Sequence, residues 1–445
     1  MSVRATIAAA AAREHLAYDF GPVRDLTGRA LYAAAQALRR TGRRADAFAL
    51  LMRTHSGNFS DAVDRRIEEE LRDATARERR GVRTGLWDAY DRVVTRATAA
   101  FRAGPRPDPR RLVGSRLLVA KSSRGSERGV LYVDYSYVFA SLAGLFDLSA
   151  IVARYDLVLE PSWADVCNPE VLLYSRVGSP VFVETIEPRD HRVLATLGAD
   201  LRPVAVAANY WVDYRVIEPV ASARRDIDVI MVAAWAGIKR HWRFFKTIAA
   251  LKRRGHRLRV ALVGYRYDKT LEDIREQAEY FGIGDQVELF ERLPQREIAA
   301  LLSRSKVHVL WSRRECANRA IIEAMLADVP VIVRSGLTFG FPYPYINEQT
   351  GAFVDEHALG DAILDTIERR ASYSPRQWVL DHMTCQKATA AVQQAIRAAA
   401  EKAGRPWTAD LVVKTSTLDT QKYWNEADRA KFESDYRFLE DQIRR

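Results

Sequence analysis

The sequence is poor in cysteine and has no long apolar run, and each scarcity excludes a class of protein. Its three cysteines, Cys167, Cys316 and Cys385, lie far apart and form no Cys-x-x-Cys pair. This spacing argues against a disulfide framework and a structural zinc site, so a reducing compartment fits best. No stretch approaches the roughly 18 apolar residues of a membrane-spanning helix. The alanine run at residues 8–12 is short and followed by charged residues, which argues against a signal peptide and for a cytoplasmic protein.

Lysine is absent from residues 1–115, which contain 22 arginines and 14 acidic residues, whereas the whole chain has a net charge of +11. A regional basic excess favours anionic partners, and peripheral contact with the inner face of a membrane is one expectation. A solvated face of arginine-rich and alanine-rich helices explains the excess equally well. No helix-turn-helix, RNA-recognition or zinc pattern accompanies it, so no specific nucleic-acid partner is expected.

The spacing of apolar residues divides the chain into four parts. Residues 1–104 show helical spacing and predict an arginine-rich α-helical extension, which the Pro- and Gly-containing linker 104–111 ends. Strands and helices then alternate over residues 112–220, and the alternation restarts over 221–400. Such alternation predicts an α/β fold with two mainly parallel sheets covered by helices. Residues 401–445 are expected to form a C-terminal helical tail.

Phosphate-binding loops are also lacking in residues 221–400. Neither the GxGxxG pattern nor the GxxxxGK[ST] pattern occurs there. No Asp-x-Asp pair stands out, and no His, Cys and Asp cluster has the spacing of metal ligands. We therefore expect neither a metal ion nor a cofactor.

The stretch "WSRRECANRAIIEAMLADVPVIV", residues 311–333, carries the strongest functional signal. Its first glutamate, Glu315, lies in a turn after a strand, where ligands of parallel sheets bind. Its second, Glu323, lies in a helix that should begin near Ala317 and Asn318, so it is expected about two turns along and about 8 Å from the start. Free backbone N–H groups around residues 317–319 favour an anion between the two carboxylates.

A nucleotide-diphosphate sugar fits this pattern, with Glu323 accepting hydrogen bonds from the ribose and Glu315 from the sugar. The alternative makes Glu315 a surface-loop residue and Glu323 part of a solvated helix face. Spacing alone would favour that alternative, because short motifs match by chance. The ordered strands and helices around the motif favour the ligand site.

The order of elements from the Lys239 turn through "LRVALVG", "VELFERLP" and "KVHVLWSRRE" to "VPVIV" resembles the C-terminal domain of the retaining GT-B glycosyltransferases of family 4. The resemblance covers about residues 225–400. It implies two Rossmann-like domains, with the acceptor at 112–220 and the donor at 221–400. It further implies metal-independent transfer of a sugar, with retention, to a glycan or lipid-linked acceptor, with Glu315 and Lys239 as the catalytic residues.

One position departs from the family pattern. Lys239, in the turn after the first donor-domain strand, aligns with the family's phosphate-binding lysine and can neutralise a diphosphate leaving group. Five residues earlier, where the family commonly has arginine, this chain has Ala234. Arg240 or Arg319 would supply the missing charge, although a solvated position explains Arg240 equally well. The departure supports a rival function, a catalytically inactive GT-B-like protein that binds nucleotide sugars or acts as a scaffold.

The remaining candidates follow from the resemblance and from strand ends. Gly264 and Leu293 match positions where the family approaches the sugar and the base, although a strand-ending turn also explains Gly264. A core or turn position is expected for His308. The donor-binding candidates are therefore Glu323, Asn318, Arg319, Ala317, Arg240, Gly264 and Leu293.

Acceptor-side candidates lie at strand ends of the first α/β domain. The "ETIEPRDH" segment brings a base, an anion binder and a helix cap into one turn, although helix capping and solvent exposure explain the same residues. This domain also lacks the Gly-rich turn often found after the first strand of the fold. The candidates are Glu187, Asp190 and His191, with the strand-end carboxylates Asp134, Glu160 and Glu184.

Overall fold

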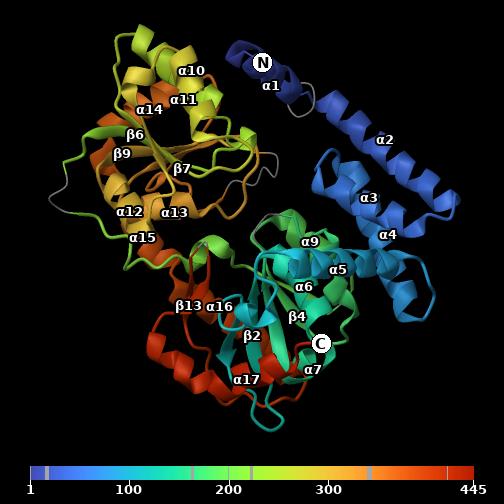
Figure 1. Cartoon of the computed structure of the whole chain (residues 1–445). Coiled ribbons are helices and arrows are strands. Elements are labelled where there is room, and N and C mark those ends of the chain that lie inside the picture. Colours follow the sequence, from blue (N-terminus) through green and yellow to red (C-terminus); the bar gives the residue numbers. More distant parts are fainter. Residues whose placement is uncertain are drawn as a thin grey trace. The chain divides into compact units, whose positions relative to one another are not determined.

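The structure is a computed structural model that describes residues 2–15, 20–161, 165–198, 200–220, 224–337, 343–417 and 419–444. The chain forms two compact units (Figure 1). Unit 1 comprises Met1–Phe20 and Val212–Thr384, and unit 2 comprises Gly21–Trp211 and Cys385–Arg445. The predicted α/β class, with parallel sheets and an N-terminal helical region, is confirmed. None of the described helices has the length and apolar composition needed to cross a membrane.

Unit 1 contains a six-stranded parallel sheet in the order β11-β10-β9-β6-β7-β8. Counted along the chain, the strand order reverses between the neighbours β6 and β9, which is the Rossmann arrangement. The turns that follow these two strands therefore flank the crevice where ligands of such sheets bind. Its elements are α1 (Val3–Glu14), β6 (Ile227–Val232), α10 (His241–Arg253), β7 (Val260–Gly264), α11 (Leu271–Tyr280), β8 (Val287–Glu291), α12 (Gln295–Ser303), β9 (Ser305–Leu310), α13 (Arg319–Leu326), β10 (Val331–Arg334), β11 (Gly351–Val354), α14 (Leu359–Glu368) and α15 (Pro375–His382).

Several strands of this sheet are aliphatic, as expected for a parallel sheet that helices cover on both faces. The segments "VALVG" of β7 and "VIV" of β10 are buried along their length, which is typical of parallel strands between helix layers. Phe244, Phe245 and Ile248 of α10 pack into the same core. His308 of β9 is completely buried, as expected for a core histidine, and burial lowers its pKa to about 3.

Unit 2 contains a five-stranded sheet in the order β1-β2-β3-β4-β5, with β1 antiparallel and the others parallel. Its strands follow one another in chain order, so the sheet has no reversal of strand order of the kind that forms the ligand crevice in unit 1. Its elements are α2 (Gly21–Arg40), α3 (Arg44–Ser56), α4 (Asp61–Arg79), α5 (Leu86–Ala103), β1 (Leu117–Lys121), β2 (Gly129–Asp134), α6 (Ser136–Leu145), α7 (Leu148–Arg154), β3 (Tyr155–Glu160), α8 (Pro169–Leu172), β4 (Val181–Glu184), α9 (Pro188–Thr196), β5 (Leu201–Val204), α16 (Cys385–Lys402), β12 (Lys414–Ser416), β13 (Gln421–Tyr423) and α17 (Glu433–Asp441).

The C-terminal segment belongs to unit 2 (Figure 1). The sequence-based boundary placed residues up to 400 with the donor domain, whereas α16, from Cys385 onward, packs in unit 2. Residues 401–445 were expected to be helical, yet they also contain the β12–β13 hairpin. The amide of Val412 donates to the carbonyl of Ala120 (2.9 Å), which joins this segment to β1. Long-range strand contacts of this kind leave no local periodicity in the sequence.

Candidate functional site

The two turns that flank the unit 1 crevice bring Lys239 and Glu315 together. Lys239 ends a short 3-10 turn after β6, and Glu315 lies in the turn after β9. The amide of Arg313 donates to the carbonyl of Ile238 (2.9 Å), so the turns are hydrogen-bonded to each other. The Lys239 ammonium forms an ion pair with Glu315 Oε1. A cation and a carboxylate, 76 residues apart in the chain, thus meet where the parallel sheet reverses its order.

Glu315 is held from three sides and is not a surface-loop residue. Its side chain is 4% exposed. Ser312 Oγ donates to Glu315 Oε1 (2.7 Å), and the Tyr343 hydroxyl donates to the Glu315 carbonyl (2.7 Å). Ser312 and Tyr343 were not among the sequence candidates, because nothing in a serine or tyrosine by itself marks a contact made only in the folded chain.

The helix after Glu315 begins at Arg319, one to two residues after the expected start near Ala317 and Asn318. Asn318 is the N-cap of α13 and accepts a hydrogen bond from the Ile321 amide through Oδ1 (3.2 Å). Arg319 is the first helical residue, which leaves early amides of α13 pointing towards the turn that contains Ala317. This end of a helix favours an anion by its dipole and its N–H groups.

Glu323 lies closer to that helix start than the sequence suggested. It is the fifth residue of α13, about 6 Å along the axis, which is just over one turn and not two. The side chain is 9% exposed, so a solvated helix face is excluded. Gln295 Nε2 donates to Glu323 Oε1 (3.2 Å). Burial raises the pKa of Glu323, although Arg319 and Gln295 oppose this.

Three other donor-side candidates differ in their burial and in their contacts. Gly264 ends β7, where an added Cβ would approach the Ala233 carbonyl to 2.3 Å, so close backbone packing alone requires glycine. Leu293 follows β8 and is half-buried at the same edge of the sheet. Arg240 is 1% exposed and ion-paired with Glu14 and Glu356. Its guanidinium is therefore engaged away from solvent, in contrast to the solvated position considered from sequence.

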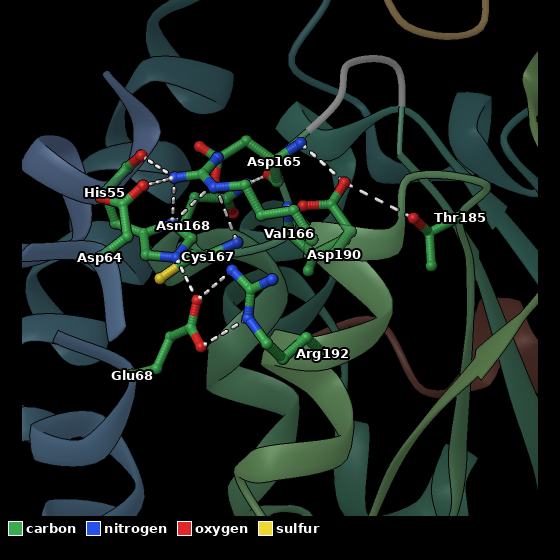
Figure 2. Close-up of polar contacts among 11 residues, drawn as sticks. His55, Asp64, Glu68, Asp165, Val166, Cys167, Asn168, Thr185, Asp190 and Arg192 are labelled. Atoms are coloured by element: carbon green, nitrogen blue, oxygen red, sulfur yellow. Dashed lines mark hydrogen bonds and ion pairs between the residues drawn. The ribbon is translucent and has the colours of Figure 1, made fainter. Parts of the chain in front are cut away.

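The acceptor-side candidates Glu187, Asp190 and His191 lie in unit 2, around the start of α9; Figure 2 shows Asp190. Asp190 accepts hydrogen bonds from the amides of Asp165 (3.0 Å) and Val166 (3.2 Å), which anchors the loop after β3. The His191 ring bonds to the Thr185 carbonyl (2.7 Å). Glu187 precedes the helix and is buried. Loop anchoring accounts for Asp190 without a role as a base.

A buried histidine next to this group was missed by the sequence analysis. His55 of α3 contacts Glu68 (3.0 Å) and Asp165 (3.7 Å), and Arg192 of α9 also pairs with Glu68 (3.0 Å) (Figure 2). Burial opposes protonation of His55, but Cys167 and the two carboxylates outweigh it and raise its pKa well above the usual range. The helical extension is thus fixed to α9 by charged side chains from segments distant in sequence.

The three strand-end carboxylates of unit 2 form a second buried cluster. Asp134, Glu160 and Glu184 are the last residues of β2, β3 and β4. Lys414 of β12, which the sequence gave no reason to select, forms an ion pair with Glu160. Trp211 Nε1 donates to Glu184 Oε2 (2.9 Å). Burial, together with the charge on Glu160, raises the pKa of Glu184 to about 8.

The raised pKa of Glu184 predicts a loss of stability at alkaline pH. Its folded pKa lies above its ordinary value of 4.5, so its contribution to stability is fully present below that value and is lost as the pH rises towards 8. Glu184→Gln keeps an acceptor for Trp211 but cannot ionise. We expect the fall in Tm between pH 6 and pH 9 to be smaller in this variant, measured by thermal unfolding. Part of the fall remains, because burial and the charge on Glu160 also raise the pKa of Asp134, to about 7. The surface substitution Glu69→Gln should leave the fall unchanged, and an equal fall in Glu184→Gln would contradict the assignment.

A known family of proteins matches the part of the chain that forms the unit 1 sheet. Residues 216–377 match the family model described as glycosyl transferases group 1. This segment therefore resembles the group 1 glycosyl transferases. The match includes Lys239, Glu315 and Glu323 and confirms the family resemblance inferred from the motif. The matched residues include all six strands of the unit 1 sheet, whereas unit 2 lies outside them.

Several solved structures resemble part of the chain at low sequence identity. Sucrose-phosphate synthase from Thermosynechococcus elongatus is 17% identical over 62% of this chain and 74% of its own, with a TM-score of 0.47. Anabaena Alr3699/HepE, solved with UDP and glucose, is 15% identical over 60% of this chain and 77% of its own, with a TM-score of 0.44. The C-terminal domain of the group 1 protein LpcC from Francisella tularensis is 15% identical over 39% of this chain and 98% of its own, with a TM-score of 0.34. None of the curated proteins compared with the chain matched it.

Within the described part of the chain, no group of three or more His, Cys, Asp or Glu side chains has a geometry that could hold a metal ion.

Proposed function

We propose that the chain transfers a sugar from a nucleotide-diphosphate sugar to a glycan or lipid-linked acceptor, with retention of configuration and without a metal ion. The observation that carries this proposal is the ion pair between Lys239 and Glu315 at the crevice of the unit 1 sheet, next to the start of α13. The pair places a cation within reach of an elongated anionic ligand. It also places there a carboxylate that can accept hydrogen bonds from sugar hydroxyls. No cofactor is required.

Each side chain has a distinct role in this proposal. The Lys239 ammonium and the first amides of α13 stabilise the charge that develops on the departing diphosphate. Glu315, held by Ser312 and Tyr343, accepts hydrogen bonds from sugar hydroxyls. Glu323 accepts hydrogen bonds from the ribose, while Gly264 and Leu293 lie at the edge nearest the sugar and the base. Fixed charges in a buried site act more strongly than in water, because the surroundings screen them less.

The acceptor is expected at unit 2. Its hydroxyl would attack the sugar from the face that the diphosphate leaves, so that no protein nucleophile is needed. Glu187, Asp190 and His191 mark the loop edge along which the acceptor would approach. Asp190 would act there by fixing the loop, because both of its oxygens already accept backbone amides.

An inactive nucleotide-sugar-binding protein is the second candidate, and one observation favours it. Ala234 replaces the arginine that the family commonly carries, and Arg240 is already paired with Glu14 and Glu356. Incubation with UDP-, GDP-, ADP- and dTDP-sugars separates the two candidates through release of the nucleoside diphosphate. Release from one donor class would establish transferase chemistry, whereas binding of a donor without release would favour the inactive protein.

Peripheral membrane contact through α2–α5 is part of the proposal. Several arginines of these helices are paired with acids, as in Arg29–Asp25 and Arg43–Asp46, so the available charge is smaller than the composition implies. We expect the full chain to co-sediment with vesicles that contain phosphatidylglycerol, and to be released as salt screens the charges. Equal binding to neutral phosphatidylcholine vesicles, or no binding to either, would contradict this contact.

A further inference from the structure

A four-residue charged cluster joins α1 to the turn that contains Lys239. Glu14, at the end of α1, pairs with Arg240 (3.0 Å) and with Arg243 (3.0 Å) through the same oxygen, Oε2. Glu356 pairs with Arg240 (3.1 Å) and Arg243 (2.5 Å) from the other side. Two guanidinium groups and two carboxylates therefore form a closed ring of contacts within unit 1. The helix α1 also contacts α11 of the same unit.

Two members of this cluster are buried and two are partly exposed. Arg240 is 1% exposed and Glu14 is 5% exposed, whereas the side chains of Arg243 and Glu356 are 14% and 30% exposed. Removal of one partner from a buried set of ion pairs leaves a charge that is poorly compensated, which is strongly destabilising. Without Glu14, Arg240 keeps only its pair with Glu356, which Arg243 shares. The guanidinium of Arg240 therefore depends in part on Glu14, a residue 226 positions away in the chain.

Arg240 also has a backbone conformation that needs support. Its φ is +57°, in the left-handed region that residues with a Cβ rarely adopt. The Arg240 amide donates to the Gly237 carbonyl (3.1 Å), and the Lys239 amide donates to the Ala236 carbonyl (2.9 Å), so these bonds close the turn before α10. Arg240 is both the end of this turn and the N-cap of α10. Contacts that fix its side chain therefore fix the turn.

We propose that Glu14 of α1 is a positioning residue of the donor site: it holds Arg240 in place and thereby aims Lys239 at the donor diphosphate. This inference rests on the proposed function of Lys239. Through Arg240, the N-terminal helix then contributes to donor binding, although α1 lies more than two hundred residues before the glycosyltransferase domain. It also assigns Arg240 to support of the turn and not to contact with the phosphates.

The test compares Glu14→Ala and Glu14→Gln with Arg13→Ala in the full chain. Arg13 lies next to Glu14 on the same helix but is exposed, so its replacement is a matched control. Two quantities are measured: hydrogen exchange of the Lys239 and Arg240 amides, and the dissociation constant of the nucleoside diphosphate that the wild type binds. We expect Glu14→Ala to raise the exchange rate of these amides and the dissociation constant about tenfold each. Glu14→Gln, which keeps an acceptor oxygen but loses the charge, should show a smaller rise, and Arg13→Ala none.

The outcomes separate this inference from the proposed function. Wild-type exchange and affinity in both Glu14 variants would overturn the positioning role. A lower Tm without faster exchange at Lys239 and Arg240 would also overturn it, because it would make Glu14 a purely structural residue. If exchange becomes faster but the wild type binds none of UDP, GDP, ADP or dTDP, the positioning of the turn stands and the proposed function fails.

Discussion

Replacement of Lys239 by alanine is expected to lower kcat for nucleotide-sugar turnover by about 10²–10³-fold, the usual effect of removing one electrostatic group that stabilises a transition state. Lys239 is 8% exposed and lies at the reversal point of the sheet, where little water screens its charge. Charge accumulates on the diphosphate as the glycosidic bond breaks. The loss should therefore be larger in kcat than in KM, because the interaction strengthens in the transition state.

This prediction needs two controls, because Lys239→Ala also leaves Glu315 buried without its ion-pair partner. Lys246→Ala, an exposed lysine on the adjacent helix α10, should keep wild-type kcat. Lys239→Ala with Glu315→Gln removes both charges and should recover Tm without recovering turnover. Recovery of turnover in the double variant would mean that Lys239 only balances Glu315 and has no role in catalysis.

Replacement of Glu323 by alanine is expected to weaken nucleotide binding about 10- to 100-fold, measured by equilibrium titration. Hydrogen bonds to a charged group contribute about 1.5–3 kcal/mol, which corresponds to this range. Glu323 is buried beside the start of α13, and Gln295 supports only one of its oxygens. The matched control is Glu297→Ala, an exposed glutamate of α12. Equal affinities in the Glu323 variant and the wild type would remove Glu323 from the donor site.

The same residue predicts a pH dependence of binding. Burial raises the pKa of Glu323, so the carboxylate that accepts ribose hydroxyls is lost at a higher pH than for an ordinary glutamate. Nucleotide affinity should therefore fall as the pH is lowered through this raised pKa. Glu323→Gln should show a weaker affinity that no longer changes over the same pH range.

The architecture of unit 1 could be predicted because its signals are local. Aliphatic strands such as "VALVG" and "VIV" alternate with amphipathic helices, and the motif places one glutamate in a turn and the other in α13. Asn318 then provides the N-cap that starts this helix, close to where the sequence placed it. The spacing overestimated the distance of Glu323 from the helix start. The helix begins at Arg319, two residues later than Ala317, its first expected position.

The contacts that complete the site could not be predicted in the same way. Glu14 reaches Arg240, Tyr343 reaches Glu315, and Lys414 reaches Glu160 across long stretches of chain. Hydrophobic periodicity reports which face of an element is buried but not which distant element covers it. For the same reason the sequence did not show that α16 and the β12–β13 hairpin pack with unit 2.

Calorimetric titration of UDP, GDP, ADP and dTDP into the wild type, Glu323→Ala and Lys239→Ala tests the central claim most directly. The account predicts that one nucleotide binds selectively to the wild type and that both substitutions weaken it, Glu323→Ala by about 10- to 100-fold. That result would also identify the base of the donor. If none of the four binds, or if both variants bind as tightly as the wild type, the crevice between the β6 and β9 turns is not a nucleotide-sugar site.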